Sequence, residues 1–362
     1  TGSKGLESSL EKSTYKYALV AWLEEMARMV KSFKFSAGSQ LHIRRADEKT
    51  LRYLGARTRH FTILLLQYRS LVAFKVIITA AMLIVGVILL LNQQMNIGQF
   101  VAAEIIILTI INSIEKIIVN LDSVYEVLTS VEKISKVTDK PVEYSGTYRL
   151  AEEEGIRITA EGLGFAYPER AVLKNLSFDI SSGQKVGITG HDGSGKSTLL
   201  KILTGIYGGL EGSLLLNEVP IGNYNLESLR QKTGIFFLYE NIFNGTLQEN
   251  LTMGRQVNQP YLHSLVMQTG LTDFLKTLPQ GYDTELDPTG KRLPMNVVQK
   301  ILLVRALAHQ PRLLLLEEPW RGLEEPSRHN IQQLLLTLPQ ATVMVATNDE
   351  AFLRQAQQVI RL

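Results

Sequence analysis

One segment of the 362-residue chain combines glycines, a lysine and a serine at a spacing suited to binding phosphate. Residues 190–197 read Gly-His-Asp-Gly-Ser-Gly-Lys-Ser, between the apolar segment 185–189 and the helical sequence 198–203. In a strand, loop and helix of this kind, backbone amides surround phosphate oxygens, Lys196 reaches the terminal phosphates and Ser197 holds Mg²⁺. The alternative is a glycine turn that carries Lys-Ser by chance. We expect these residues to bind a nucleotide: Gly190, His191, Asp192, Gly193, Ser194, Gly195, Lys196, Ser197 and Thr198.

A pair of acids supplies the other half of this chemistry. The apolar segment 312–316 ends at Glu317 and Glu318, and in a parallel sheet this end meets the phosphate loop. We expect Glu317 to complete the Mg²⁺ shell and Glu318 to orient and deprotonate an attacking water. Without the phosphate loop, the same pair would be read as solvated acids after a strand.

Composition divides the chain into two halves near residue 140. All eleven prolines lie from Pro141 onward, so a helical half precedes a turn-rich half. We expect a helical domain over residues 1–137, a linker over 138–155 that contains an acidic run, and a nucleotide-binding domain over 156–362.

The helical half contains two apolar runs of membrane length. Residues 71–91 are interrupted only by Lys75, and a second run covers 97–118 after a short polar turn. We expect spans at about 61–91 and 97–118, with an amphipathic helix continuing out of the membrane to residue 137. Arginines and lysines crowd the sequence before the first span, which indicates the cytoplasmic side. The alternative is a buried helical pair in a large soluble domain.

Four charged residues lie inside these runs: Lys75, Glu104, Glu115 and Lys116. At a rise of about 1.5 Å per residue from the intervening turn, Lys75 and Glu115 lie at similar depth, while Glu104 lies much nearer the turn. We expect Lys75 to pair with Glu115 or to extend toward the interface, and Glu104 to face a wet cavity or a partner helix.

Other counts exclude several kinds of function. The absence of cysteine excludes disulfides, thiolate nucleophiles and thiolate-bound zinc, and the six histidines are scattered without metal-ligand spacing. A net charge of +3 does not indicate a nucleic-acid surface. The N-terminal sequence is polar and helical, so we expect no signal peptide.

The order of these motifs resembles the ATP-binding-cassette (ABC) family, and the resemblance covers nearly the whole chain. Gly-Phe-Ala-Tyr-Pro at 164–168 is similar to the family's adenine-stacking segment, and Phe-Asn-Gly-Thr at 243–246 is similar to the loop that faces the membrane domain in exporters. The resemblance implies an α/β P-loop NTPase domain preceded by an all-α transmembrane hairpin with long cytosolic extensions. It also implies ATP and Mg²⁺ as cofactors and Tyr167 as the stacking ring, although a tyrosine packed on a strand edge would look the same. By the same resemblance, 17–29 is a coupling helix and four further spans precede this chain.

The sequence also departs from the family pattern. Leu238 stands where a glutamine is usual, Glu317 where aspartate is usual, and Asn348 where a histidine is usual. The signature segment Leu-Ser-Gly-Gly-Gln is Leu-Pro-Met-Asn-Val at 293–297, and the run after Glu318 contains Arg-Gly-Leu-Glu at 321–324.

Three functions are compatible with these features. The first is one half of an exporter in an inner or plasma membrane, with its ATP-binding domain in the cytoplasm, which pairs with a second half-transporter and moves an unknown substrate. The second is a regulatory half that binds ATP while a partner hydrolyses it, and the altered signature favours it. The third is a membrane-tethered phosphate-loop enzyme unrelated to transport, such as a kinase, for which the sequence shows no acceptor-site motif and no lid-type arginine pattern. The sequence does not distinguish a homodimer from a heterodimer.

Overall fold

The computed structural model divides the chain into two units, Thr1–Pro141 and Val142–Leu362. It describes residues 2–36, 38–151, 155–238, 240–287 and 293–362. The acidic residues 152–154 of the predicted linker lie outside the described residues.

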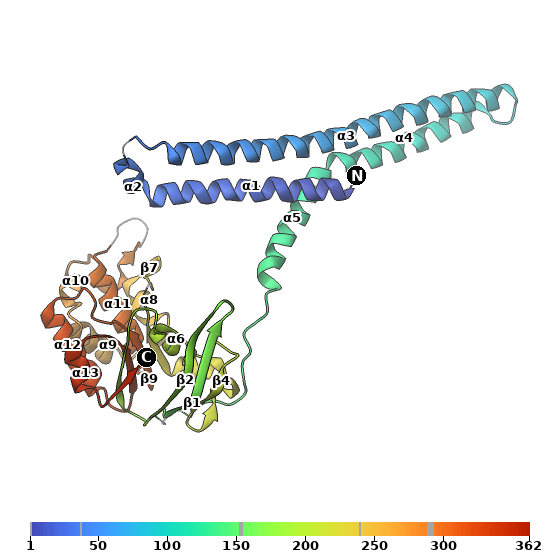
Figure 1. Cartoon of the computed structure of the whole chain (residues 1–362). Coiled ribbons are helices and arrows are strands. Elements are labelled where there is room, and N and C mark those ends of the chain that lie inside the picture. The colour runs from blue at the N-terminus through green and yellow to red at the C-terminus, as the bar shows by residue number, and fades with distance from the viewer. Residues whose placement is uncertain (1, 37, 152–154, 239, 288–292) are drawn as a thin grey trace. The chain divides into compact units, whose positions relative to one another are not determined.

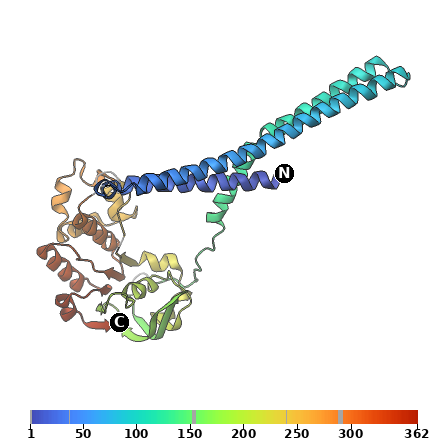
Figure 2. The same cartoon turned by 45° about the horizontal axis from the view of Figure 1, so that its top comes forward.

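In the described residues of the first unit, 2–36 and 38–141, the chain forms five helices. They are α1 (Gly2–Arg28), α2 (Val30–Phe35), α3 (Leu41–Leu91), α4 (Ile97–Val119) and α5 (Leu121–Thr138). In both views α1 lies along the first half of α3 and α4 lies along its second half, so α3 joins the two pairs (Figures 1 and 2). Helix α1 also packs against α5.

The apolar runs form the predicted hairpin of α3 and α4. Asn96 and Gln99 make a reciprocal capping box at the start of α4, so the polar turn defines where the second helix begins. Within the described residues, α3 and α4 are the two helices long and apolar enough to cross a membrane. Only 6% of the most apolar window of each helix is buried, unlike a core helix of a soluble domain. The predicted ion pair is confirmed: Lys75 Nζ lies 3.0 Å from Glu115 Oε2.

The predicted coupling helix is not a separate element. Residues 17–28 are the last turns of the 27-residue α1, and the chain reverses through the six-residue α2. The indole N–H of Trp22 donates to the carbonyl of His42 at 3.2 Å, and its ring packs edge-on against Phe33. Trp22 therefore belongs to the packing of the helical unit. Phe35, at the end of α2, is 89% exposed.

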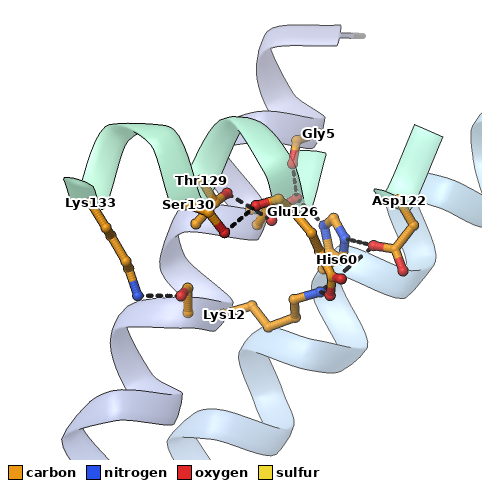
Figure 3. Close-up of polar contacts among 11 residues, drawn as sticks. Gly5, Lys12, His60, Asp122, Glu126, Thr129, Ser130 and Lys133 are labelled. Atoms are coloured by element: carbon orange, nitrogen blue, oxygen red, sulfur yellow. Dashed lines mark hydrogen bonds and ion pairs between the residues drawn. The ribbon is translucent and has the colours of Figure 1, made fainter. Parts of the chain in front are cut away.

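A cluster of polar side chains joins α1, α3 and α5 (Figure 3). His60 of α3 is 3% exposed, and its ring nitrogens lie 2.8 Å from the Ser8 hydroxyl of α1 and 2.8 Å from the Asp122 carboxylate of α5. Lys12 lies 3.6 Å from Asp122 and 3.3 Å from Glu126. Burial would raise the pKa of Asp122, but the hydrogen bond from His60 and the charge of Lys12 hold it below its ordinary value.

The second unit is built on three sheets. The four-stranded sheet has the order β2-β1-β4-β5, the five-stranded sheet β11-β3-β10-β9-β6, and the short sheet β7-β8. Every pairing in the five-stranded sheet is parallel. The strands are β1 (Ile158–Tyr167), β2 (Arg170–Ile180), β3 (Lys185–Thr189), β4 (Glu211–Leu216), β5 (Val219–Pro220), β6 (Thr233–Phe236), β7 (Gly245–Thr246), β8 (Glu285–Leu286), β9 (Leu313–Glu317), β10 (Thr342–Ala346) and β11 (Gln358–Arg361).

Helices surround the parallel sheet. They are α6 (Lys196–Ile202), α7 (Leu226–Gln231), α8 (Leu247–Thr252), α9 (Gln259–Gln268), α10 (Thr272–Lys276), α11 (Met295–Leu307), α12 (Glu325–Thr337) and α13 (Glu350–Gln355). Strands β3, β9 and β10 read as almost continuous buried apolar runs, as expected where helices cover both faces of a sheet. Their carboxyl ends lie at one edge, which is where parallel α/β sheets bind ligands.

Part of the predicted linker belongs to this second unit. Gly146 N donates to the carbonyl of Tyr224 at 2.9 Å, Tyr148 pairs with Tyr224 in a short bridge, and Leu150 is buried in the core. The carboxylate of Glu143 forms a two-point ion pair with Arg230, which holds the pKa of Glu143 below its ordinary value. The boundary between the units is thus sharper than the sequence indicates.

Candidate functional site

A cavity of about 680 Å³ opens at the carboxyl edge of the parallel sheet. Residues from the predicted phosphate loop, the predicted acids and the end of β10 line it. The lining residues are Tyr167, Arg170, Val172, Asp192, Gly193, Ser194, Gly195, Lys196, Ser197, Thr198, Leu238, Glu317, Glu318, Arg321, Ala346 and Asn348. Gly190 and His191 are not among the lining residues, but their carbonyls hold the side chain of Lys196.

The phosphate loop connects β3 to α6 with the predicted strand, loop and helix geometry. Gly193 and Gly195 have φ of +80° and +105°, values that favour glycine. A Cβ on Gly195 would lie 2.7 Å from Leu173 Cδ2, so this position also needs a residue without a side chain. Lys196 Nζ donates to the carbonyls of Gly190 and His191 at 2.7 and 3.0 Å, which holds the ammonium group beside the loop.

Glu317 lies at the end of β9 and faces the first turn of α6. Its Oε1 accepts a hydrogen bond from the Ser197 hydroxyl, and its Oε2 accepts one from the backbone N–H of Leu238 at 3.1 Å. The residues predicted to hold Mg²⁺ are therefore in contact. A hydroxyl and a carboxylate oxygen match the hard oxygen ligands that Mg²⁺ prefers.

Glu318 occupies a strained backbone position beside Glu317. Its φ of +47° is rare for a residue with a side chain, and its N–H donates to the Ala346 carbonyl at 2.9 Å. The carboxylate accepts hydrogen bonds from the Thr347 hydroxyl at 3.0 Å and from Asn348 N at 3.3 Å. These contacts orient an acceptor oxygen pair at the edge of the cavity.

Asn348 joins the end of β10 to the phosphate loop. Its side-chain oxygen accepts hydrogen bonds from the Thr189 hydroxyl at 2.8 Å and from Gly190 N at 3.3 Å. The residue that departs from the family's histidine thus contacts the loop itself.

Tyr167 lies at the cavity wall within a group of aromatic rings. Its ring is 5.7 Å from Tyr207 and 5.1 Å from Phe165, in edge-to-face arrangements. Its hydroxyl lies 3.5 Å from the Thr198 hydroxyl. The tyrosine is therefore a packing residue at a strand edge that also lines the cavity.

The altered signature segment begins α11. Pro294 is the residue before the helix and contributes no side-chain cap, and Met295 is 72% exposed. A second cavity of about 410 Å³ lies beside the first and is lined by Leu238, Met295, Phe236, Phe237, Glu240, Val298, Gln299, Leu302, Arg321 and Gly322. Leu238 thus lines both the nucleotide cavity and this second, more apolar cavity.

Sequence reasoning missed two parts of the site. The contact between Glu317 and Leu238 uses a backbone amide, which no residue type in the sequence reveals. Arg170 lines the cavity from the first residue of β2, and the sequence signal for it was its place just after the segment 164–168 that resembles the adenine-stacking segment.

The parallel sheet, the glycine loop and the paired acids define a P-loop nucleotide-binding domain. Residues 173–321 match the model of the family described as "ABC transporter", so this part of the chain is similar to the ATP-binding domain of that family. ATP is accordingly its ligand.

Two curated relatives match this chain over most of its length. The ATP-dependent lipid A-core flippase of Burkholderia orbicola is 27% identical over 301 residues, 82% of this chain and 50% of that protein. The glutathione/L-cysteine transport system ATP-binding/permease protein CydC of Haemophilus influenzae is 31% identical over 242 residues, 65% of this chain and 42% of that protein. The chain spans half or less of the length of these relatives.

A solved structure shares the fold of the whole chain. It is described as a bacterial Atm1-family ABC exporter with ATP bound, with a TM-score of 0.87, 20% identity, and coverage of 100% of this chain and 64% of that one. The helical unit and the ATP-binding domain therefore each have an exporter fold, as the sequence predicted.

Proposed function

We propose that this chain is the ATP-hydrolysing part of an ABC exporter half that moves a substrate across a membrane. The observation that carries the proposal is the contact between Ser197 and Glu317 in a cavity of about 680 Å³, within a chain that also contains two helices of membrane length. A nucleotide site covalently joined to such a hairpin has little use outside transport. The homologues named above support the same reading.

The site residues have distinct proposed roles. Lys196 would bind the terminal phosphates, Ser197 and Glu317 would hold Mg²⁺, and the backbone of residues 190–195 and 198 would surround the phosphates. Bound Mg²⁺ would neutralise charge on the phosphate oxygens. Tyr167 would offer its ring to adenine.

Glu318 is the proposed general base. The hydroxyl of Thr347 and the backbone N–H of Asn348 fix its carboxylate, so its free lone pairs can point at a water beside the terminal phosphate. The strained φ of Glu318 is consistent with a position selected for function.

A second half-transporter, of the same or another sequence, is the proposed partner. The lipid bilayer would surround α3 and α4, with the ATP-binding domain on the cytoplasmic side where basic residues precede the span. The complete group of membrane helices would determine which substrate is transported. The turn at α2, rather than residues 17–29, is the proposed coupling segment.

The regulatory alternative rests on the start of α11. Pro294 supplies neither an amide hydrogen nor a hydroxyl, and Met295 projects a large exposed side chain where glycine is usual. If two hydrogen bonds to a charged phosphate are lost, the cost is about 3 to 6 kcal/mol, or roughly a hundred- to ten-thousandfold in rate. Such a chain would bind ATP and leave hydrolysis to its partner.

One set of variants tests the proposal. Lys196→Ala should abolish MgATP binding, whereas Glu318→Gln should preserve binding and reduce turnover by about a hundredfold or more. Both are measured in the full assembly in lipid vesicles, with His329→Gln, an exposed change in α12, as the control. Full MgATP binding by Lys196→Ala would reject the site. Turnover that is slow in the parent and rises when Leu-Ser-Gly-Gly-Gln is placed at 293–297 would favour the regulatory alternative.

A further inference from the structure

Glu317 uses its two carboxylate oxygens for two different elements. One oxygen accepts a hydrogen bond from the Ser197 hydroxyl at the start of α6. The other accepts a hydrogen bond from Leu238 N, 3.1 Å away, in the chain that leaves β6. Leu238 has no polar side-chain atom, so its backbone N–H is the donor that it can offer at this place.

The length of the acid makes this double contact possible. Strands β6 and β9 are parallel neighbours with Phe236 opposite Leu316, so Leu238 lies just beyond the ladder on the side of Glu317. Glutamate is one methylene longer than aspartate, an extension of about 1.5 Å. An aspartate at the same backbone position could approach Ser197 or the Leu238 amide, but its shorter side chain would not reach both.

The segment that Glu317 holds is connected to an exposed aromatic side chain. After Leu238, the described residues 240–244 are fixed by Arg305, whose guanidinium donates to the carbonyl of Asn241 at 3.2 Å and to Asn250 Oδ1 at 3.1 Å. The fully buried Asn250 accepts a hydrogen bond from Phe243 N at 3.0 Å. Leu238 is therefore the point at which this hydrogen-bonded segment touches the nucleotide cavity.

We propose that Glu317 is a positioning residue for the segment between β6 and α8, and that the glutamate at 317 and the apolar residue at 238 form a compensating pair. The backbone N–H of Leu238, held by the longer acid, replaces a side-chain amide at position 238. The inference rests on the proposed function of the cavity. It predicts that shortening the acid and adding an amide at 238 have coupled effects.

Hydrogen exchange of the full chain measures the contact directly. In the nucleotide-free parent, the Leu238 amide should exchange slowly, and in Glu317→Asp it should exchange about tenfold faster or more, since a hydrogen bond to a charged acceptor is lost. Fluorescence of the buried Trp320, followed in a Trp22→Phe background, verifies that the variant is folded. Unchanged protection of the Leu238 amide in Glu317→Asp would overturn the proposal. This result does not depend on whether the chain hydrolyses ATP.

A double-mutant cycle on MgATP affinity tests the compensation. Glu317→Asp should weaken MgATP binding about tenfold, whereas Leu238→Gln alone should not raise the affinity for MgATP. The affinity of the double variant should return to within about threefold of that of the parent. Val172→Gln, which adds the same amide to another wall of the cavity, is the control and should not rescue Glu317→Asp. Equal effects of Leu238→Gln in both backgrounds would contradict the pairing. Failure of the parent to bind MgATP would instead reject the proposed function.

Discussion

At the scale of single residues, Asn348 stands where the family usually has a histidine, and its side chain still makes hydrogen bonds at the nucleotide cavity. Its side-chain oxygen accepts hydrogen bonds from Thr189 and Gly190, while its backbone N–H contacts Glu318. The end of β10 is thus tied to both sides of the cavity. An amide oxygen cannot donate a hydrogen bond, so this oxygen can hold the loop but cannot itself contact a phosphate oxygen.

His309 should make the stability of the ATP-binding domain sensitive to acid. Burial, together with the charges of Arg255 and Lys232, lowers the pKa of His309 from 6.5 to about 4. As the pH falls from 6.5 toward 4, the histidine of the unfolded chain takes up a proton and the folded one stays neutral. The free energy of unfolding should therefore fall across this window, by at most about 3 kcal/mol.

The measurement is urea unfolding at pH 7 and pH 4.5, followed by Trp320 fluorescence in a Trp22→Phe background. His309→Gln should reduce the loss of stability between the two pH values, because it removes the titrating side chain. Glutamine is chosen because it can still donate to the Thr233 carbonyl that His309 Nε2 contacts at 3.3 Å. His329→Gln, on the exposed face of α12, should not change the loss. An equal loss in the parent and in His309→Gln would contradict the assignment.

At the scale of elements, the sequence predicted those parts of the fold and site that are formed by one contiguous segment. The glycine loop and its lysine and serine are contiguous, so strand, loop and helix could be read from one segment, and the apolar runs defined α3 and α4. The cluster around His60 could not be read in this way, because Ser8 and Asp122 lie 52 and 62 residues from His60 in the sequence. Scattered histidines gave no sign of it. The start of α2 was also missed, since the apolar periodicity of α1 continues to the turn.

His60 should hold three helices together through a complete set of hydrogen bonds. The Ser8 hydroxyl also donates to the Gly5 carbonyl at 2.9 Å. Both ring nitrogens of His60 therefore have a hydrogen-bonding partner, the Ser8 hydroxyl on one side and the Asp122 carboxylate on the other. The edge of the Tyr125 ring lies against it, and Lys12 and Glu126 complete the surrounding charges.

Replacing His60 by alanine should leave Ser8 and Asp122 without this partner and destabilise the helical unit by about 2 to 3 kcal/mol. Hydrogen exchange of the first half of α1 should accelerate, while exchange in the ATP-binding domain should not change. His329→Ala removes an exposed histidine from another helix and serves as the matched control. Unchanged exchange in α1 would show that the cluster adds no stability.

The pair of Lys75 and Glu115 should be required for assembly of the membrane hairpin. The two side chains lie on facing helices 3.0 Å apart, and Asn112 Oδ1 lies 3.4 Å from the same ammonium group. An unpaired charge at this depth is costly, so Lys75→Glu or Glu115→Lys alone should reduce the amount of folded protein in membranes. The double swap should restore it. An equal loss of folded protein in the double variant would reject the pair. That Glu104 faces a wet cavity or a partner helix stays a prediction.

At the scale of the whole molecule, the sequence predicted a helical half and an α/β half but placed their boundary too loosely. A count of prolines locates a change in composition, whereas the contacts of Gly146, Tyr148 and Leu150 decide which unit a segment packs against. The same limit applies to the coupling segment. Amphipathic spacing in residues 17–29 is equally satisfied by packing inside a helical unit, and only three-dimensional contacts separate that packing from docking on a partner.

The turn at α2 should dock on an ATP-binding domain through Phe35. This side chain is 89% exposed at the end of a helix that also carries Lys31 and Lys34, and Met29 and Val30 at the start of the same turn are 41% and 45% exposed. Several exposed apolar side chains in one turn favour a partner surface. Phe243 is the proposed acceptor: it is 39% exposed and lies under the Arg305 guanidinium at 5.9 Å, in the loop that resembles the membrane-facing loop of exporters. By the resemblance to exporters, we expect this contact to be made with the other subunit.

Cysteine crosslinking in the full assembly distinguishes the two possible coupling segments. This chain has no cysteine, so Phe35→Cys with Phe243→Cys introduces the thiols at known places. We expect a crosslink between subunits in at least one nucleotide state. The matched control pairs Phe243→Cys with Trp22→Cys, which should not crosslink because residue 22 packs against Phe33 and His42. A crosslink from position 22 and none from position 35 would return the coupling role to the end of α1, and no crosslink from either would reject docking at Phe243.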